Sequence, residues 1–106
     1  MEEYTWPARV APDVPWPSPD DVWAATIAAL PVGASVAGEV IGRQPFGVFI
    51  RIDGLPGAMG LAEIIDIPEG MGLPVLGARI RGEVLDHVEH NRQVRVRLHE
   101  AGTALG

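Results

Sequence analysis

The chain has 106 residues, no cysteine and a formal net charge of −6 at pH 7. A chain of this length can bury one modest hydrophobic core, so we expect one small domain with an accessory segment. The missing cysteines exclude a disulfide framework and a thiolate metal site. The negative charge argues against a protein that binds nucleic acid by long-range attraction alone.

Residues 1–17 form a proline-rich segment that contains WP at 6–7 and PWP at 15–17. Proline fixes its own φ angle and lacks a backbone N–H, so we expect an extended, irregular arm. Trp6 and Trp16 are expected to pack with the helix that follows. Alternatively, they contact a partner protein, because tryptophan is costly to leave in water and is enriched at interfaces.

Residues 18–30 predict a short α-helix. The sequence SPDD at 18–21 supplies a capping serine, a proline at the first helical position and two acids that favour the positive end of the helix dipole. Trp23, Ile27 and Leu30 then fall on one stripe. Such a stripe must be buried, so we expect the helix to cap one end or one side of the domain that follows.

Residues 42–54 read as the end of one strand, a tight turn at PFG and a second strand. Even-numbered positions from 48 to 52 carry valine or isoleucine and point inward, whereas Phe49 and Arg51 point outward. An exposed aromatic ring beside a cation suits single-stranded nucleic acid, because bases stack on rings and phosphates pair with cations. Alternatively, Phe49 lies under the N-terminal segment or under a loop.

Residues 76–98 contain most of the basic side chains. In the last strand, valines and a leucine alternate with polar residues. We therefore expect the apolar side chains to point inward and Arg95 and Arg97 to point outward. In the preceding strand, Arg79 and Arg81 flank an inward isoleucine. These arginines either contact phosphates or simply form the solvated outer face of the domain.

Several segments together resemble the S-one RNA-binding domain, the repeat unit of the largest protein of the small ribosomal subunit. They are LPVGASVAGEV at 30–40, PFGVFI at 45–50, GAMGLAEI at 57–64, LGARIRGEVL at 76–85 and NRQVRVRL at 91–98. The resemblance implies an all-β fold, a five-stranded antiparallel OB-fold barrel over residues 31–100, with RNA held on its open face. The Trp/Pro-rich arm and one short α-helix would precede the barrel, and a flexible tail would follow at 101–106.

The resemblance also assigns positions to the family's contact residues. Its two surface aromatics fall on Phe46 and Phe49, and the basic residue that opens its last strand falls on Arg92 or on the residue that follows. The segment at 57–64 lies where the family has Gly-Leu-Val-His-Ile-Ser-Glu. The histidine of that sequence falls on Gly60 and its serine on Ala62, so we expect both of those contacts to be missing here.

No motif in the sequence indicates an enzyme. Histidines and acids gather in DHVEH at 86–90, with His99 further along, and such groups can bind a divalent metal. Polar residues also collect at turns, so we predict no metal site and no cofactor. The loop at 65–74, with two prolines and two glycines, is expected to be ordered, with at most one helical turn.

No apolar run approaches the roughly 18 residues that a membrane span requires. The first three residues lack the basic start of a secretory signal. We therefore expect a cytoplasmic protein with no membrane partner. The use of arginine for all eight basic residues is typical of a bacterial genome rich in GC.

These observations predict a small stand-alone protein that binds single-stranded RNA weakly. The expected contact residues are Phe46, Phe49, Arg51, Arg92, Arg95 and Arg97. The alternative is a protein-interaction module that keeps the S-one barrel but has lost RNA binding. Its partner would contact Trp6, Trp16 or the barrel face.

Overall fold

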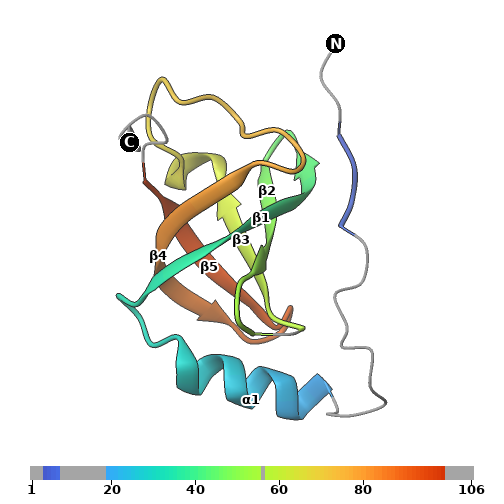
Figure 1. The fold of residues 1–106 in the computed structure, drawn as a ribbon, viewed down its shortest axis with the longest axis vertical. Helices are drawn as coiled ribbons and strands as arrows, with labels where there is room; N and C mark the ends of the chain where they lie inside the picture. Colours follow the sequence, from blue (N-terminus) through green and yellow to red (C-terminus); the bar gives the residue numbers. More distant parts are fainter. Residues whose placement is uncertain (1–3, 8–18, 56, 100–106) are drawn as a thin grey trace.

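The computed structural model describes residues 4–7, 19–55 and 57–99. Within these residues the elements are α1 (Pro19–Ala29), β1 (Ser35–Gln44), β2 (Gly47–Ile52), β3 (Met59–Glu63), the 3-10 turn η1 (Ile64–Asp66), β4 (Arg79–Val88) and β5 (Gln93–Leu98). The strands form a closed barrel in the order β1-β2-β3-β5-β4 (Figure 1). The predicted all-β OB-type barrel with one short helix is confirmed. The predicted tail at 101–106 and most of the arm lie outside the described residues.

One neighbouring pair in the barrel is parallel rather than antiparallel. β3 and β5 run in the same direction from Met59 opposite Gln93 to Leu61 opposite Arg95, while the other four pairs are antiparallel. A closed ring with an odd number of strands cannot alternate in direction throughout. One parallel pair is therefore required to close a five-stranded barrel.

Two β-bulges allow the long strands to bend around the barrel, and a glycine allows two of them to approach closely. The register shifts between Val40 and Gly42 in β1 and between Val84 and Asp86 in β4. Bulges bend a strand and increase its twist, as barrel closure requires. A Cβ atom on Gly38 would lie 2.3 Å from the carbonyl oxygen of Arg51. Only glycine permits this close approach of β1 to β2.

Alternating residues of the five strands fill the barrel interior. The predicted inward residues of β2 and β5 are buried, together with inward residues of the other strands: Val36, Val40, Val48, Ile50, Ile52, Ala62, Ile80, Val84, Val94, Val96 and Leu98. The inward orientation expected from the sequence is therefore confirmed for both strands. This core fixes which side chains point out from β2, β3 and β5.

Helix α1 closes one end of the barrel (Figure 1). Trp23 and Leu30 are buried in the core cluster, and Ile27 packs against it, as the apolar stripe predicts. His87 of β4 fixes the end of the helix, because its Nε2 lies 2.7 Å from the carbonyl oxygen of Leu30. Its ring also meets the Trp23 ring edge-on, with centroids 6.2 Å apart. No helix in the described part of the chain is long and apolar enough to cross a membrane.

The β3–β4 connection lies at the opposite end of the barrel from α1 (Figure 1). Its one helical element is the 3-10 turn η1, which agrees with the expectation of at most one helical turn. The buried side chain of Arg43 holds the connection to β1. Its Nε donates to the carbonyl of Pro74 at 2.9 Å, and a terminal nitrogen donates to the carbonyl of Leu73 at 3.2 Å.

Candidate nucleic-acid interface

The β1–β2 hairpin presents two phenylalanine rings on the outside of the barrel. Phe46 lies in the two-residue turn and is 45% exposed. Phe49 points outward from β2, yet it is only 5% exposed. The two rings meet edge-to-face with centroids 6.0 Å apart. The expectation that Phe49 is solvent-exposed is therefore wrong, and the alternative, that another segment covers it, is correct.

The covering segment is the N-terminal arm. The Trp6 ring lies 6.0 Å from both phenylalanine rings, between centroids. Thr5 forms a one-residue bridge to β1, because its N–H donates to the Arg43 carbonyl and its carbonyl accepts from the Arg43 N–H, both at 2.7 Å. Trp6 thus packs on the barrel rather than with the helix, which corrects the sequence-based expectation. Trp16 lies outside the described residues.

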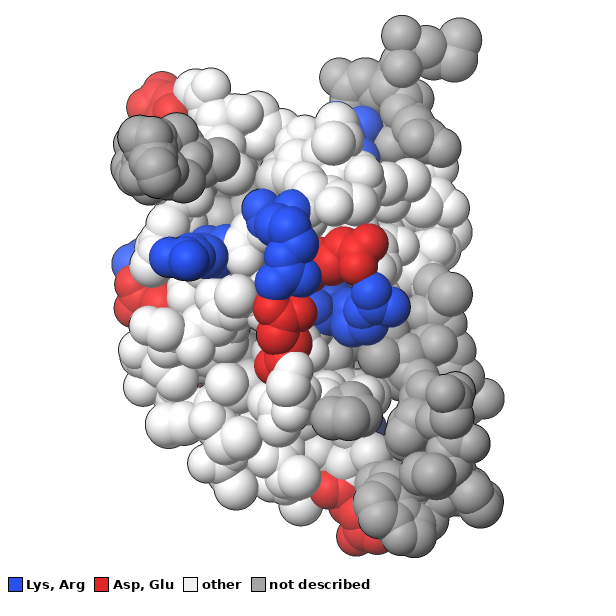
Figure 2. All heavy atoms as spheres, viewed as in Figure 1, with Lys and Arg blue, Asp and Glu red and all other residues white. Residues whose placement is uncertain are grey.

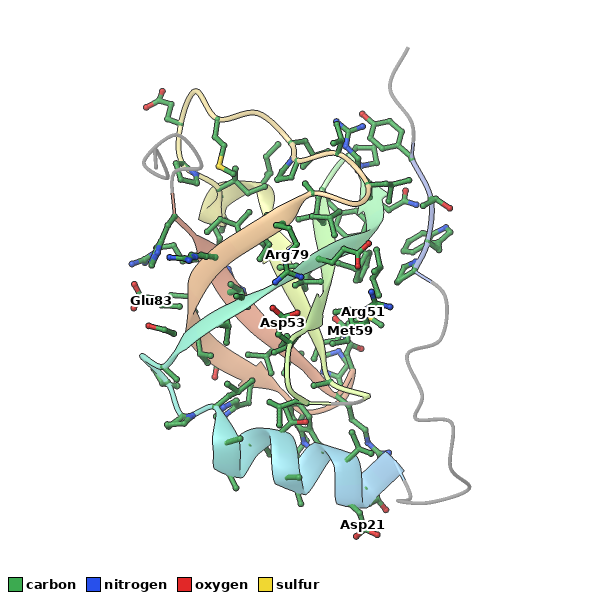
Figure 3. All side chains as sticks on the ribbon, viewed as in Figure 1. Asp21, Arg51, Asp53, Met59, Arg79 and Glu83 are labelled. Atoms are coloured by element: carbon green, nitrogen blue, oxygen red, sulfur yellow. The ribbon has the colours of Figure 1, made fainter. Side chains whose placement is uncertain are left out.

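Strand pairing aligns the outward side chains in two rows across β2, β3 and β5. One row contains Phe49, Leu61 and Arg95. The next contains Arg51, Met59 and Gln93, and Figure 3 shows Arg51 and Met59 side by side. This set, together with Phe46, is called the β2–β3–β5 face. Sequence reasoning missed Met59 and Leu61 as members of this face, and it missed Trp6 as the residue that packs beside it.

Arg51 is exposed but already has a carboxylate partner. Its guanidinium lies 2.5 Å from Glu39 of β1, and its side chain is 57% exposed. Beside this pair, Arg79 donates to Asp53 and holds the pKa of that carboxyl below its ordinary value, chiefly through the hydrogen bond. Figure 2 shows the basic and acidic groups in contact across the middle of this view. The positive charge of these arginines is therefore largely neutralised locally.

Arg95 is tied into the structure more firmly than Arg51. Its guanidinium lies 2.5 Å from Asp66 of η1 and 3.9 Å from Glu63, and the Asp66 side chain is only 8% exposed. The hydrogen bond to Asp66 raises the pKa of Arg95, and the charges of Asp66, Glu63 and Asp86 add to this effect. Three acids surround one cation, so Arg95 is better suited to anchoring η1 than to meeting a phosphate.

Arg92 and Arg97 lie at the margins of the β2–β3–β5 face. Arg92 occupies the β4–β5 turn with a left-handed φ of 53° and forms an ion pair with Asp20 of α1. Arg97 lies opposite Glu83 of β4 and is exposed. Among the described residues it forms no ion pair. The structure therefore places Phe46, Phe49, Arg51 and Arg95 on one face, with Arg92 and Arg97 at its margins.

The structure corrects the positions assigned to the family's histidine and serine. Gly60 and Ala62 both point into the barrel, and a Cβ atom on Gly60 would lie 3.3 Å from a methyl group of Val96. A side chain there cannot reach a ligand on the outside. The family sequence Gly-Leu-Val-His-Ile-Ser-Glu instead fits residues 60–66, GLAEIID. That register places the histidine on Glu63, which points outward and lies near Arg95.

The histidine-rich turn does not form a metal centre within the described residues, where no three histidine or carboxylate groups gather around one point. His87 instead contacts the Leu30 carbonyl and the Trp23 ring, as described above. His90 and His99 are exposed. The polar cluster therefore belongs to a turn and to the contact between α1 and the barrel.

No protein-family model matches the sequence, and no curated protein is similar to it. The structure is similar to RNase R from Mycoplasma genitalium, with a TM-score of 0.61 and 17% identity over 74% of this chain and 15% of that chain. The same values hold for that protein in complex with ribose methylated single-stranded RNA. The chain therefore spans less than a sixth of the RNase R that it matches.

Two smaller proteins have a similar structure. GSP13 from Bacillus subtilis gives a TM-score of 0.54 and 26% identity over 69% of this chain and 58% of that chain. An uncharacterized protein from Methanocaldococcus jannaschii gives a TM-score of 0.54 and 17% identity, covering 68% of this chain and 96% of that one. The likeness in fold confirms the expected S-one-type OB barrel.

Proposed function

We propose that this barrel binds single-stranded RNA, weakly, through the β2–β3–β5 face. The observation that carries the proposal is the pairing of an exposed aromatic ring with an exposed guanidinium on an S-one-type barrel. Phe46 is 45% exposed, and Arg51 projects from the same strand as Phe49. Bases stack on such rings without regard to sequence, and a guanidinium pairs with the phosphate between them.

The charge distribution supports weak and salt-sensitive binding. The net charge of −6 repels RNA at long range. Arg51 and Glu39 form an exposed pair, and exposed pairs contribute only about 0–1 kcal/mol, so a phosphate can replace the carboxylate at little cost. Arg92 can exchange Asp20 for a phosphate in the same way. We assign Arg95 to holding η1, and we give Arg97 only a peripheral contact.

A titration of labelled oligouridine of about ten nucleotides, a length suited to one OB fold, tests the proposal by fluorescence anisotropy. We expect saturable binding that weakens as salt rises, and a loss of about tenfold in affinity for Phe46→Ala, because one stacking contact is removed. The matched control is Val32→Ala, which removes an exposed apolar side chain from the α1–β1 connection. The proposal is wrong if the wild-type protein does not saturate, or if the control loses as much affinity as Phe46→Ala.

A second candidate function is protein binding, through an apolar surface beside the β1–β2 turn that contains Phe46. Ile64 and Ile65 of η1 are 57% and 78% exposed, and the Ile64 N–H donates to the Phe46 carbonyl at 2.8 Å. A protein partner, or a second copy of this chain, would bury these side chains favourably. Sedimentation of the wild type and of Ile65→Asp tests this function. Self-association that Ile65→Asp abolishes, in a protein that does not respond to RNA, would favour it.

A further inference from the structure

We infer that the N-terminal arm completes the RNA-binding surface, with Trp6 as a stacking residue and Phe49 as the buried support beneath it. This inference rests on the proposed function and names a binding residue outside the barrel. It differs from the expectation that the two phenylalanines of the hairpin provide the aromatic contacts by themselves.

The arm is docked by backbone and side-chain contacts to one residue of β1. Thr5 and Arg43 exchange two backbone hydrogen bonds of 2.7 Å. The Tyr4 ring lies over the Arg43 guanidinium, 5.4 Å from ring centroid to the central carbon. The same guanidinium donates to the β3–β4 connection through Leu73 and Pro74. Arg43 therefore positions the arm and the neighbouring loop together, at the end of the barrel where Phe46 lies.

The sequence of β1 leaves space for the arm. Gly42 pairs with Phe49, and a Cβ atom on Gly42 would lie 2.7 Å from the ring of Pro7 and 3.0 Å from the ring of Phe49. Glycine inside a strand marks a point where another segment approaches closely. Here it allows Pro7 to lie directly on β1, so that Trp6 reaches the two phenylalanine rings.

The exposed fractions distinguish a binding surface from a simple cover. With the arm docked, Phe49 is only 5% exposed, whereas the larger Trp6 residue is 65% exposed. A segment that served only to cover the barrel would bury its own apolar ring. Trp6 and Phe46 are instead neighbours with tilted rings, 45° between their planes, and both residues remain exposed. Each ring can therefore receive one base.

The cation on the same face favours RNA over an apolar peptide as the occupant. Arg51 follows Phe49 at the next outward position of β2 and is largely exposed. Arginine beside stacked rings can contact the phosphate that links two bases. An apolar peptide would gain nothing from this charge.

Two variants of the full-length chain test the role of the arm. Trp6→Ala removes the ring, whereas Gly42→Ala keeps every aromatic residue but forces Pro7 off β1. We expect both to lower affinity for the oligouridine probe about tenfold, as the loss of one stacked base would. Trp6→Phe keeps a ring and should restore most of the affinity. In NMR spectra, the Trp6 indole N–H signal should shift with RNA in the wild type but not in Gly42→Ala.

The other outcomes separate the inference from the proposed function. If Phe46→Ala weakens binding while Trp6→Ala and Gly42→Ala do not, the inference is overturned and the proposed function stands. If removing Trp6 strengthens binding, the arm competes with RNA and the inference is also overturned. If the wild type shows no binding, the proposed function and the inference both fail. Circular dichroism shows whether Gly42→Ala folds, and Trp6→Ala, a surface change, provides the test if it does not.

Discussion

The two described tryptophans lie outside the strands of the barrel, and they differ sharply in their environment. Trp23 of α1 is 7% exposed and belongs to the core cluster, whereas Trp6 of the arm is 65% exposed and meets Phe46 and Phe49 on the outer face. Both follow the same physical rule, since an indole gains free energy when it leaves water. The difference shows that α1 completes the fold, whereas the arm adds a surface to it.

The contacts around each tryptophan lead to the same conclusion. At the helix end, His87 of β4 packs on Trp23 and contacts the Leu30 carbonyl, so that helix and barrel share one core. Within the described residues of the arm, the backbone link to the barrel is a single bridge between Thr5 and Arg43. Loss of the helix should therefore unfold the domain, while loss of the arm should leave a folded barrel with a weaker binding face.

The largest expected effect is on stability and comes from Trp23→Ala. Removing a buried indole loses its transfer free energy and leaves a cavity, which together cost about 3–5 kcal/mol. Trp6→Ala removes an exposed ring and should change the free energy of unfolding by only about 0.5 kcal/mol. Urea denaturation followed by circular dichroism measures both. Equal losses would mean that the arm is part of the core, and the contrast between the two regions would disappear.

A smaller effect sharpens the contrast between Arg95 and Arg51. Asp66→Ala leaves the partly buried Arg95 without its main acceptor, and we expect a loss of about 1–3 kcal/mol of unfolding free energy. Glu39→Ala breaks an exposed pair and should cost less than about 1 kcal/mol.

The same two variants differ in their expected effect on RNA binding. Glu39→Ala frees Arg51 and removes a negative charge, so affinity for oligouridine should rise severalfold. Asp66→Ala should change affinity less, because Arg95 still lies near Glu63 and Asp86. A rise confined to Asp66→Ala would contradict the structural role assigned to Arg95 and would identify it as the phosphate contact.

Much of the fold, but only part of the face, follows from the sequence. Strict alternation in β2 and β5 identifies the inward residues, and the odd number of strands then requires one parallel pair. The contact of Trp6 with Phe49 cannot be predicted from alternation, because Trp6 lies in a proline-rich segment that has no periodic pattern. The available signal was Gly42, a glycine inside β1 that marks a close approach.

The misplaced histidine position has a similar local cause. The glycines at 57 and 60 let the family sequence fit in two registers. The residues flanking Gly60 are apolar but point outward, so the hydrophobic pattern of β3 did not distinguish the inner from the outer face. Pairing with β2 and β5 fixes the register, and that information is absent from a single strand.

The smallest expected effect concerns acid stability on the β1–β2–β4 surface. Arg79 lowers the pKa of Asp53 from its ordinary value of 3.8. This contribution to stability is fully present above the ordinary pKa and is lost as the pH falls through the lower value of the folded state. The wild-type protein should therefore lose a little stability as the pH falls, and Asp53→Asn should not show this part of the loss. Urea unfolding midpoints measured from neutral to acidic pH test this prediction. Glu83→Gln, at an outward position without a described ion pair, should leave that dependence intact.

The central claim is that the arm and the hairpin form one RNA-binding surface, and an NMR titration of the full chain with oligouridine tests it most directly. We predict that the Trp6 indole signal and the backbone amides of residues 46–51 and 59–61 shift together, and that the shifts weaken with salt. The amides of α1 beyond its first turn should stay still. A spectrum that does not move, or shifts that include the hairpin but not the Trp6 indole, would contradict the claim.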